Sequence, residues 1–133
     1  MKIAISAMGT TLDAEIDPRF GRCQYFIIVD PDTMQFEAIE NSGAMAGGGA
    51  GISTAQTIAG KGIEAVLTGN CGPNAYQVLE AAGIKVVTGV SGKVQDAIQN
   101  YKSGNLKASS HPNVAEHFGM GRGMGRGRGM GRR

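Results

Sequence analysis

Two cysteines are the side chains with the most distinctive chemistry in this sequence of 133 residues. Cys23 ends the run Phe-Gly-Arg-Cys, and Cys71 lies much later in Gly-Asn-Cys-Gly-Pro. Thiolates are soft ligands that suit metals with an affinity for sulfur. Two cysteines cannot by themselves complete a structural zinc site or a four-iron cluster. We therefore expect free thiols that meet a transient metal-sulfur cargo, with burial as ordinary core residues as the competing interpretation.

The residues around these cysteines favour an anionic ligand. Arg19 and Arg22 stand just before Cys23, and the Gly72-Pro73 pair after Cys71 is typical of a helix start. The free amides of a helix N-terminus attract anions and lower the pKa of a nearby thiol. We therefore expect Cys71 to be a thiolate in a cationic site. The thioethers of two nearby methionines could add soft contacts or fill gaps in the core: Met8 and Met45.

The pattern of apolar residues predicts the elements that position these side chains. Short apolar or alternating runs, bounded by turn residues, predict strands at residues 2–7, 24–30, 34–40, 64–68 and 84–88. Helical spacing and capping residues predict helices at residues 52–61, 73–82 and 93–102. A glycine-rich stretch at residues 43–51 separates the third strand from the first helix. The chain is therefore expected to be an α/β protein with three helices.

The order of these elements predicts a mixed five-stranded sheet. A meander of three strands followed by right-handed crossovers favours the strand order 3-2-1-4-5, with strand 2 antiparallel and helices on both faces. In this arrangement both cysteines come to the same edge of the sheet, on opposite sides of strand 1. Open α/β sheets bind ligands at this kind of edge, beside the strand where the order reverses. We therefore expect the binding site between strands 1 and 4.

An ordered set of motifs resembles the dinitrogenase iron-molybdenum cofactor biosynthesis family. The matching segments are KIAIS, FGRCQYFIIVD, ENSGAMAGGGAG, IEAVLTGNCGPNAYQVLEAAGIKVV and VQDAIQNYKSGNL, within residues 1–107. The resemblance implies a ribonuclease H-like three-layer fold and a noncatalytic role in binding and carrying iron- or molybdenum-containing sulfide clusters. It also implies partners that donate and receive the cluster, with a cluster-handling ATPase as a further candidate. Many family members have His at the position of Arg19 and an apolar residue at that of Cys71.

Sequence and resemblance together give a set of candidate site residues. Cys23 and Cys71 are the candidate metal ligands. The residues expected to contact or enclose the cargo lie in the two cysteine-containing turns, the glycine loop and the end of strand 1: Met8, Arg19, Phe20, Gly21, Arg22, Gly47, Gly48, Gly49, Gly51, Gly69, Asn70, Gly72 and Asn74.

Several enzyme classes do not fit the sequence. The glycine loop lacks the Lys of a phosphate-binding P-loop, and it follows the third strand rather than the first as a Rossmann fingerprint would. The first strand carries no acidic residue, whereas a two-metal nuclease needs clustered carboxylates. Both histidines lie beyond residue 110, so no Cys-His or Ser-His-acid arrangement can be assembled in the body. We therefore expect no enzymatic activity.

The C-terminal residues differ in composition from the rest of the chain. Residues 117–133 contain five Arg, three Met and no acid, so the net charge of +2 hides a charge of −3 on residues 1–116. We expect residues 108–133 to be a flexible Gly/Arg/Met-rich tail, in which His111 and His117 could hold a borderline metal. An alternative function follows: a regulatory or interaction module whose tail binds an acidic partner or RNA. The acidic body itself is not expected to bind nucleic acid.

Location is predicted from what the sequence lacks. The longest apolar run, residues 25–29, is far shorter than the ~20 residues that cross a bilayer. No apolar leader follows Met1 and Lys2. We therefore expect a cytoplasmic protein without a membrane span.

Overall fold

The structure is a computed structural model that describes residues 2–41, 50–106 and 108. The elements, in chain order, are β1 (Lys2–Ala7), β2 (Tyr25–Val29), β3 (Phe36–Glu40), α1 (Ala50–Ala59), β4 (Ile63–Leu67), α2 (Pro73–Ala81), β5 (Lys85–Val87) and α3 (Val94–Lys102). All eight predicted elements are present, with ends that differ by a few residues. The predicted boundary between a body of residues 1–107 and a tail of 108–133 stays a prediction, because residues 107 and 109–133 lie outside the described part.

The five strands form one mixed sheet in the order β3-β2-β1-β4-β5. β2 is antiparallel to both β1 and β3, whereas β4 is parallel to β1 and to β5. The predicted strand order and the antiparallel second strand are therefore confirmed. At one edge of the sheet, Ala7 at the end of β1 pairs with Tyr25 at the start of β2, which pairs with Glu40 at the end of β3.

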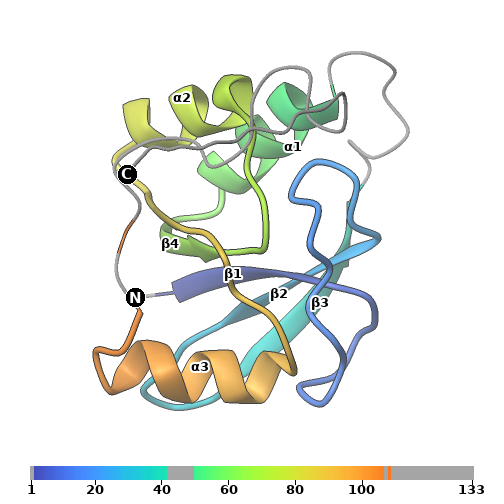
Figure 1. The fold of residues 1–133 in the computed structure, drawn as a ribbon, viewed down its shortest axis with the longest axis vertical. Helices are drawn as coiled ribbons and strands as arrows, with labels where there is room; N and C mark the ends of the chain where they lie inside the picture. Colours follow the sequence, from blue (N-terminus) through green and yellow to red (C-terminus); the bar gives the residue numbers. More distant parts are fainter. Residues whose placement is uncertain (1, 42–49, 107, 109–133) are drawn as a thin grey trace, which may run out of the picture.

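Helices cover both faces of the sheet and produce three layers (Figure 1). α1 and α2 pack on one face, where their buried residues join one apolar cluster with residues of β1, β2, β4 and β5. α3 packs on the other face, where Val94, Ala97 and Ile98 join the second cluster. The sheet is thus buried on both sides, as expected for strands joined by helical crossovers.

The first helix begins earlier than predicted. α1 starts at Ala50 and includes Gly51, whereas the sequence favours a start at Ile52 because glycine disfavours helix interiors by about 1 kcal/mol. A Cβ atom on Gly51 would lie 3.6 Å from the Cβ of Ala75, so the two helices approach closely at this point. Tertiary packing between α1 and α2 therefore outweighs the local preference.

The connection between β1 and β2 is fixed to other parts of the molecule by backbone pairing. Three isolated bridges fix it to other parts of the molecule: Ala7 with Ile16, Glu15 with Lys93, and Arg19 with Asn70. The last of these brings the Phe-Gly-Arg-Cys segment next to the segment that contains Cys71. Among the described residues, no helix has the length and apolar character needed to cross a bilayer.

Candidate functional site

The two cysteine-containing turns lie side by side at the carboxyl end of β1 and β4. The Asn70 amide donates a 2.7 Å hydrogen bond to the Pro18 carbonyl, and the Phe20 amide donates a 3.2 Å bond to the Asn70 carbonyl. Cys23 and Cys71 belong to the same buried cluster on the α1/α2 face of the sheet. We call residues 18–23 and 69–74 the cysteine rim. The prediction that chain topology brings the two cysteines to one edge is confirmed.

Gly69 makes this close approach possible. A Cβ atom at residue 69 would lie 2.7 Å from the Cα of Pro18 and 3.0 Å from its carbonyl oxygen, which is closer than real Cβ atoms come to backbone. The glycine therefore has a structural reason to be where it is. Its small size serves the contact with Pro18, and its predicted contact with cargo stays a prediction.

Asp17 anchors the first turn of the cysteine rim. Its buried carboxylate accepts hydrogen bonds from the Arg19 backbone amide at 2.9 Å and from the Arg19 guanidinium at 3.2 and 3.3 Å. The hydrogen bond and charge of Asp17 raise the pKa of Arg19. The Arg19 side chain is itself 64% exposed, so its guanidinium lies at the surface with part of its charge offset by Asp17.

The backbone of Asp17 is tied to the sheet through the Ser6 hydroxyl, which the Thr68 hydroxyl contacts in turn. Ser6, in β1, donates a 2.7 Å hydrogen bond from its hydroxyl to the Asp17 carbonyl. The same hydroxyl lies 2.7 Å from the hydroxyl of Thr68, directly after β4. Both hydroxyl-bearing residues are buried, so these bonds fix the cysteine rim relative to β1 and β4.

A second polar network surrounds Cys23. The Asn41 amide donates hydrogen bonds to the Cys23 carbonyl at 2.9 Å and the Gly21 carbonyl at 3.3 Å, and it lies 3.7 Å from the Cys23 sulfur. The Thr54 hydroxyl of α1 donates to the Asn41 side-chain oxygen at 2.9 Å. The Cys23 thiol points its hydrogen toward the Phe20 carbonyl at 3.4 Å. Asn41 and Phe20 thus hold both the backbone and the thiol of Cys23.

Both thiols are buried, and this corrects the expected thiolate at Cys71. Cys23 is 0% exposed and Cys71 is 1% exposed. Burial raises the pKa of each thiol to about 12, and the charge of Asp17 adds to the effect at Cys23. Desolvation therefore outweighs the helix N-terminus at Cys71, so both groups are protonated near neutral pH. Both side chains are thiols rather than halves of a disulfide.

The other predicted residues divide between surface and interior. The Phe20 ring is buried, with its centroid 5.3 Å from that of Phe26 at an interplanar angle of 61°, so its side chain serves the core. Met8 is 52% exposed at the end of β1. The remaining described candidates are exposed or partly exposed: Gly21, Arg22, Gly51, Asn70, Gly72 and Asn74. Met45 and Gly47 to Gly49 lie outside the described residues.

Sequence reasoning missed the polar residues that hold the site. The sequence alone assigns no role at the site to Asp17, Asn41 or Thr54. Asp17 precedes Pro18, and Asx-Pro is a common turn signal, which could have pointed to an anchored turn. The long-range partners of Asn41 leave no local pattern that a sequence could reveal.

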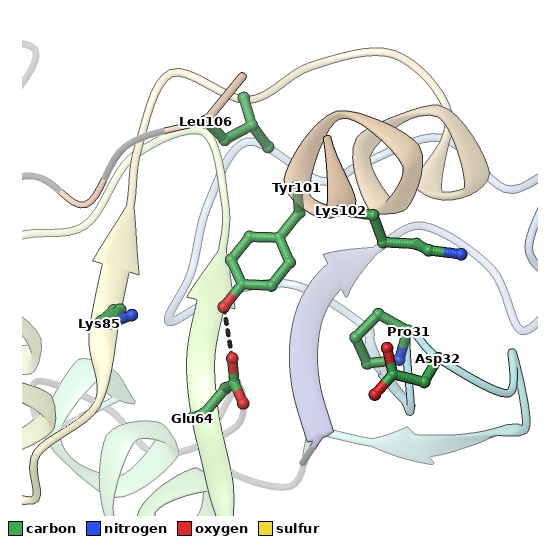
Figure 2. Close-up of a pocket in the computed structure, with 7 residues that line it drawn as sticks. All are labelled: Pro31, Asp32, Glu64, Lys85, Tyr101, Lys102 and Leu106. Carbon is green, nitrogen blue, oxygen red and sulfur yellow. Dashed lines mark hydrogen bonds between the residues drawn. The ribbon is translucent and has the colours of Figure 1, made fainter. Parts of the chain in front are cut away.

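A surface recess lies away from the cysteine rim, at the opposite edge of the sheet. Its volume is about 460 Å³, and Figure 2 shows the residues that line it: Pro31, Asp32, Glu64, Lys85, Tyr101, Lys102 and Leu106. The Tyr101 hydroxyl donates a 2.6 Å hydrogen bond to the Glu64 carboxylate. Burial and this bond raise the pKa of Tyr101 to about 12. None of the predicted site residues that the structure describes lines this recess.

Comparison with known proteins shows which family this chain belongs to. The model of the family described as "Dinitrogenase iron-molybdenum cofactor" matches residues 1–104. The chain belongs to this family. Both segments of the cysteine rim fall within the match, and residues 105–133 fall outside it. Membership connects the protein with processes that involve the iron-molybdenum cofactor.

Individual relatives support the same assignment. The orange protein of Desulfovibrio gigas, solved in its apo form, has 41% sequence identity and a TM-score of 0.82, covering 84% of this chain and 95% of its own. A Thermotoga protein solved by NMR has 36% identity and a TM-score of 0.69, covering 80% of this chain and 91% of its own. An uncharacterized protein of Methanocaldococcus jannaschii is 30% identical over 80% of this chain and 94% of that protein. The two solved structures share the fold of this chain over most of its described length.

Proposed function

We propose that this protein binds an iron- or molybdenum-containing sulfide cluster at the cysteine rim and hands it on during metallocofactor assembly, without catalysing a reaction. The single observation that carries the proposal is the pairing of the two cysteine-containing turns, which places Cys23 and Cys71 in one cluster. Membership in the dinitrogenase iron-molybdenum cofactor family supports a cargo that contains iron or molybdenum. The similarity to the orange protein, which was solved in an apo form, supports a role in binding a group.

The surface of the cysteine rim has groups that would attract an anionic metal sulfide before any thiol binds it. Met8 presents an exposed thioether nearby at the end of β1, and Arg19 presents a guanidinium. The first turn of α2 has no side-chain cap, and Pro73 occupies its start. A metal sulfide with negative charge would be attracted by the guanidinium and by the uncapped helix start.

Ligation by the thiols requires a further step. A protonated thiol is a poor ligand, so a metal that binds Cys23 or Cys71 must displace the proton. Because both cysteine residues are buried, the metal must also reach their sulfurs through movement of the cysteine rim. The proposal therefore includes an opening of the contact between residues 18–20 and 69–70, which is held by two backbone hydrogen bonds. Such an opening suits a carrier, because the same movement would release the cargo.

The experiment is reconstitution with tetrathiomolybdate plus iron or copper, followed by absorption spectroscopy and metal analysis. We compare the wild type with a Cys23→Ser, Cys71→Ser double variant. The matched control is Ile98→Val, which removes a buried methylene from the α3 cluster and retains both thiols. We expect uptake by the wild type and the control and none by the double variant. Negligible uptake by all three would refute the carrier function, and equal uptake by all three would refute ligation by cysteine.

A further inference from the structure

We propose that Asp17 and Arg19 form an anion-operated latch on the cysteine rim: an anionic metal sulfide competes with Asp17 for the Arg19 guanidinium and thereby loosens the contact between the two turns. This inference rests on the proposed function and adds the pair of residues that admits anionic metal species to the thiols in preference to metal cations. The geometry that carries it is an ion pair with one buried and one exposed partner, placed on the backbone that joins the turns.

Asp17 is the fixed partner of this pair. Its amide donates a 3.0 Å hydrogen bond to the Ser6 carbonyl, and its carbonyl accepts a 2.7 Å bond from the Ser6 hydroxyl. Ser6 is fully buried in β1, the middle strand of the sheet. The Asp17 side chain is 3% exposed, so its carboxylate depends on protein groups rather than on water for stabilisation.

Arg19 is the movable partner. Its guanidinium meets the two carboxylate oxygens of Asp17 side-on, through Nε at 3.2 Å and through a terminal nitrogen at 3.3 Å. The Arg19 side chain is largely exposed. A guanidinium has five N–H donors, and Asp17 occupies one edge of it. The outer edge can therefore meet an anion from solvent while the pair is still intact.

The backbone of Arg19 lies in the contact that closes the cysteine rim. It pairs with Asn70, and its two neighbours make the hydrogen bonds that join the turns, through the Pro18 carbonyl and the Phe20 amide. The Arg19 amide itself donates a 2.9 Å hydrogen bond to the Asp17 carboxylate. One carboxylate thus holds both the backbone and the side chain of the residue at the centre of this contact.

A bound anion weakens this arrangement. Two anionic groups then share one guanidinium, and because Asp17 is fixed to β1, the exposed guanidinium is the part that moves toward the anion. The buried carboxylate is left with less positive charge beside it, which is unfavourable. Movement of residues 17–20 toward water relieves this cost and breaks the contact with residues 69–70. The anion therefore binds the open rim better than the closed rim and shifts the equilibrium toward opening.

A metal cation does not operate the latch. It is repelled by the Arg19 guanidinium, and it carries no negative charge that could compete with Asp17. While the pair is intact, Cys23 and Cys71 stay buried. The rim thus discriminates by charge between forms of the same metal, because a thiometallate dianion opens it and the bare cation does not.

The test measures exposure of the thiols in the presence of molybdate, a tetrahedral dianion with the charge of tetrathiomolybdate but without its sulfur atoms. The full-length protein reacts with iodoacetamide in sodium molybdate or in sodium chloride of the same ionic strength. Mass spectrometry gives the modification rate of Cys23 and of Cys71.

Three variants are compared with the wild type. Arg19→Gln removes the cation, and Arg19→Lys keeps a cation without the planar fork. Lys61→Gln is the control for charge. It removes an exposed cation between α1 and β4, on the side of the sheet where β4 begins and away from the cysteine rim.

We expect molybdate to raise the modification rate of both thiols about tenfold in the wild type and in Lys61→Gln, because the rate follows the population of the open rim. Sodium chloride should have a much smaller effect, since chloride cannot make a two-point contact with the guanidinium. Arg19→Gln should react about tenfold faster than the wild type without molybdate, and molybdate should add nothing. Arg19→Lys should keep part of the response.

Other outcomes overturn the inference. Equal rates in the wild type with and without molybdate would exclude opening by an anion. A molybdate response in Arg19→Gln as large as in the wild type would exclude Arg19 as its target, and an equal response to sodium chloride would reduce the effect to ionic screening. Each of these results leaves the carrier function to the reconstitution experiment. Failure of the wild type in that experiment, with the molybdate response intact, would refute the carrier function and leave the latch.

Discussion

A Cβ atom on Gly69 would lie 2.7 Å from the Cα of Pro18, so the two cysteine-containing turns meet through a contact that only glycine permits. The Asn70 amide completes this contact with its 2.7 Å hydrogen bond to the Pro18 carbonyl. The relative position of Cys23 and Cys71 therefore depends on backbone packing between two segments that are far apart in sequence.

The Gly69→Ala variant tests this contact. Because the added methyl group meets backbone atoms that cannot rotate away, we expect a loss of about 1 to 3 kcal/mol in the free energy of unfolding, measured with urea. Gly51→Ala is the matched control, since its Cβ would make an ordinary 3.6 Å contact inside α1. That control should gain about 0.5 to 1 kcal/mol from helix propensity. Equal stability of the two variants would contradict the contact.

Asn41→Ala removes the amide that holds the Cys23 carbonyl and the Thr54 hydroxyl. We expect a loss of about 1 to 3 kcal/mol in unfolding free energy, because buried polar groups lose their partner. We also expect iodoacetamide to modify Cys23 faster in the folded protein, as monitored by mass spectrometry. Asn74→Ala, at an exposed position, is the control and should change neither quantity. If Asn41→Ala left the modification rate of Cys23 unchanged, the Asn41 side chain would not be what protects Cys23 from the reagent.

The raised thiol pKa values predict a loss of stability in alkaline solution. Unfolded thiols release their protons above about pH 9, whereas the folded thiols keep them until about pH 12. Deprotonation therefore stabilises the unfolded state first, and the free energy of unfolding falls as the pH rises through this window. Between pH 8 and pH 10 we expect a decrease of about 2 to 3 kcal/mol from the two thiols, measured by urea unfolding.

The matched variant for this pH dependence is the Cys23→Ala, Cys71→Ala double variant. Its alkaline decrease should be much smaller, with a residual part from Tyr101, whose pKa is also raised. A decrease of the same size in the wild type and the double variant would show that other groups cause the effect.

The Tyr101→Phe variant tests whether the cargo binds at the recess or at the cysteine rim. It removes the hydroxyl that donates to Glu64, and we expect a loss of about 1 kcal/mol in unfolding free energy. Uptake of tetrathiomolybdate with copper should not change, because the recess lies where β4 and β5 begin, whereas the cysteine rim lies where β1 and β4 end. A large loss of uptake in Tyr101→Phe would show that the cargo binds at the recess rather than at the cysteine rim.

The fold could be predicted because its signals are local. The alternation in β3, the helical spacing in α3 and the Gly-Pro start of α2 each fix an element, and chirality of the crossovers then limits the strand order. The structure confirms this order. The start of α1 was misplaced, because the close contact of Gly51 with Ala75 involves a helix that comes later in the sequence.

The site was predicted less completely than the fold. Topology was enough to bring Cys23 and Cys71 to one edge, since strand ends fix where the turns begin. How deeply each cysteine is buried could not be predicted, because burial depends on packing between the turns and on buried partners such as Asn41. The helix start near Cys71 suggested a thiolate, but desolvation has the larger effect on its pKa.

The most direct test of the account maps where the cargo binds. Amide resonances of the ¹⁵N-labelled full-length protein are followed by NMR during titration with tetrathiomolybdate and copper. We predict the largest shifts at Met8, in residues 18–23 and in residues 69–74, with little change at Glu64 and Tyr101. Shifts concentrated around the recess, or no shifts at saturating probe, would contradict binding at the cysteine rim.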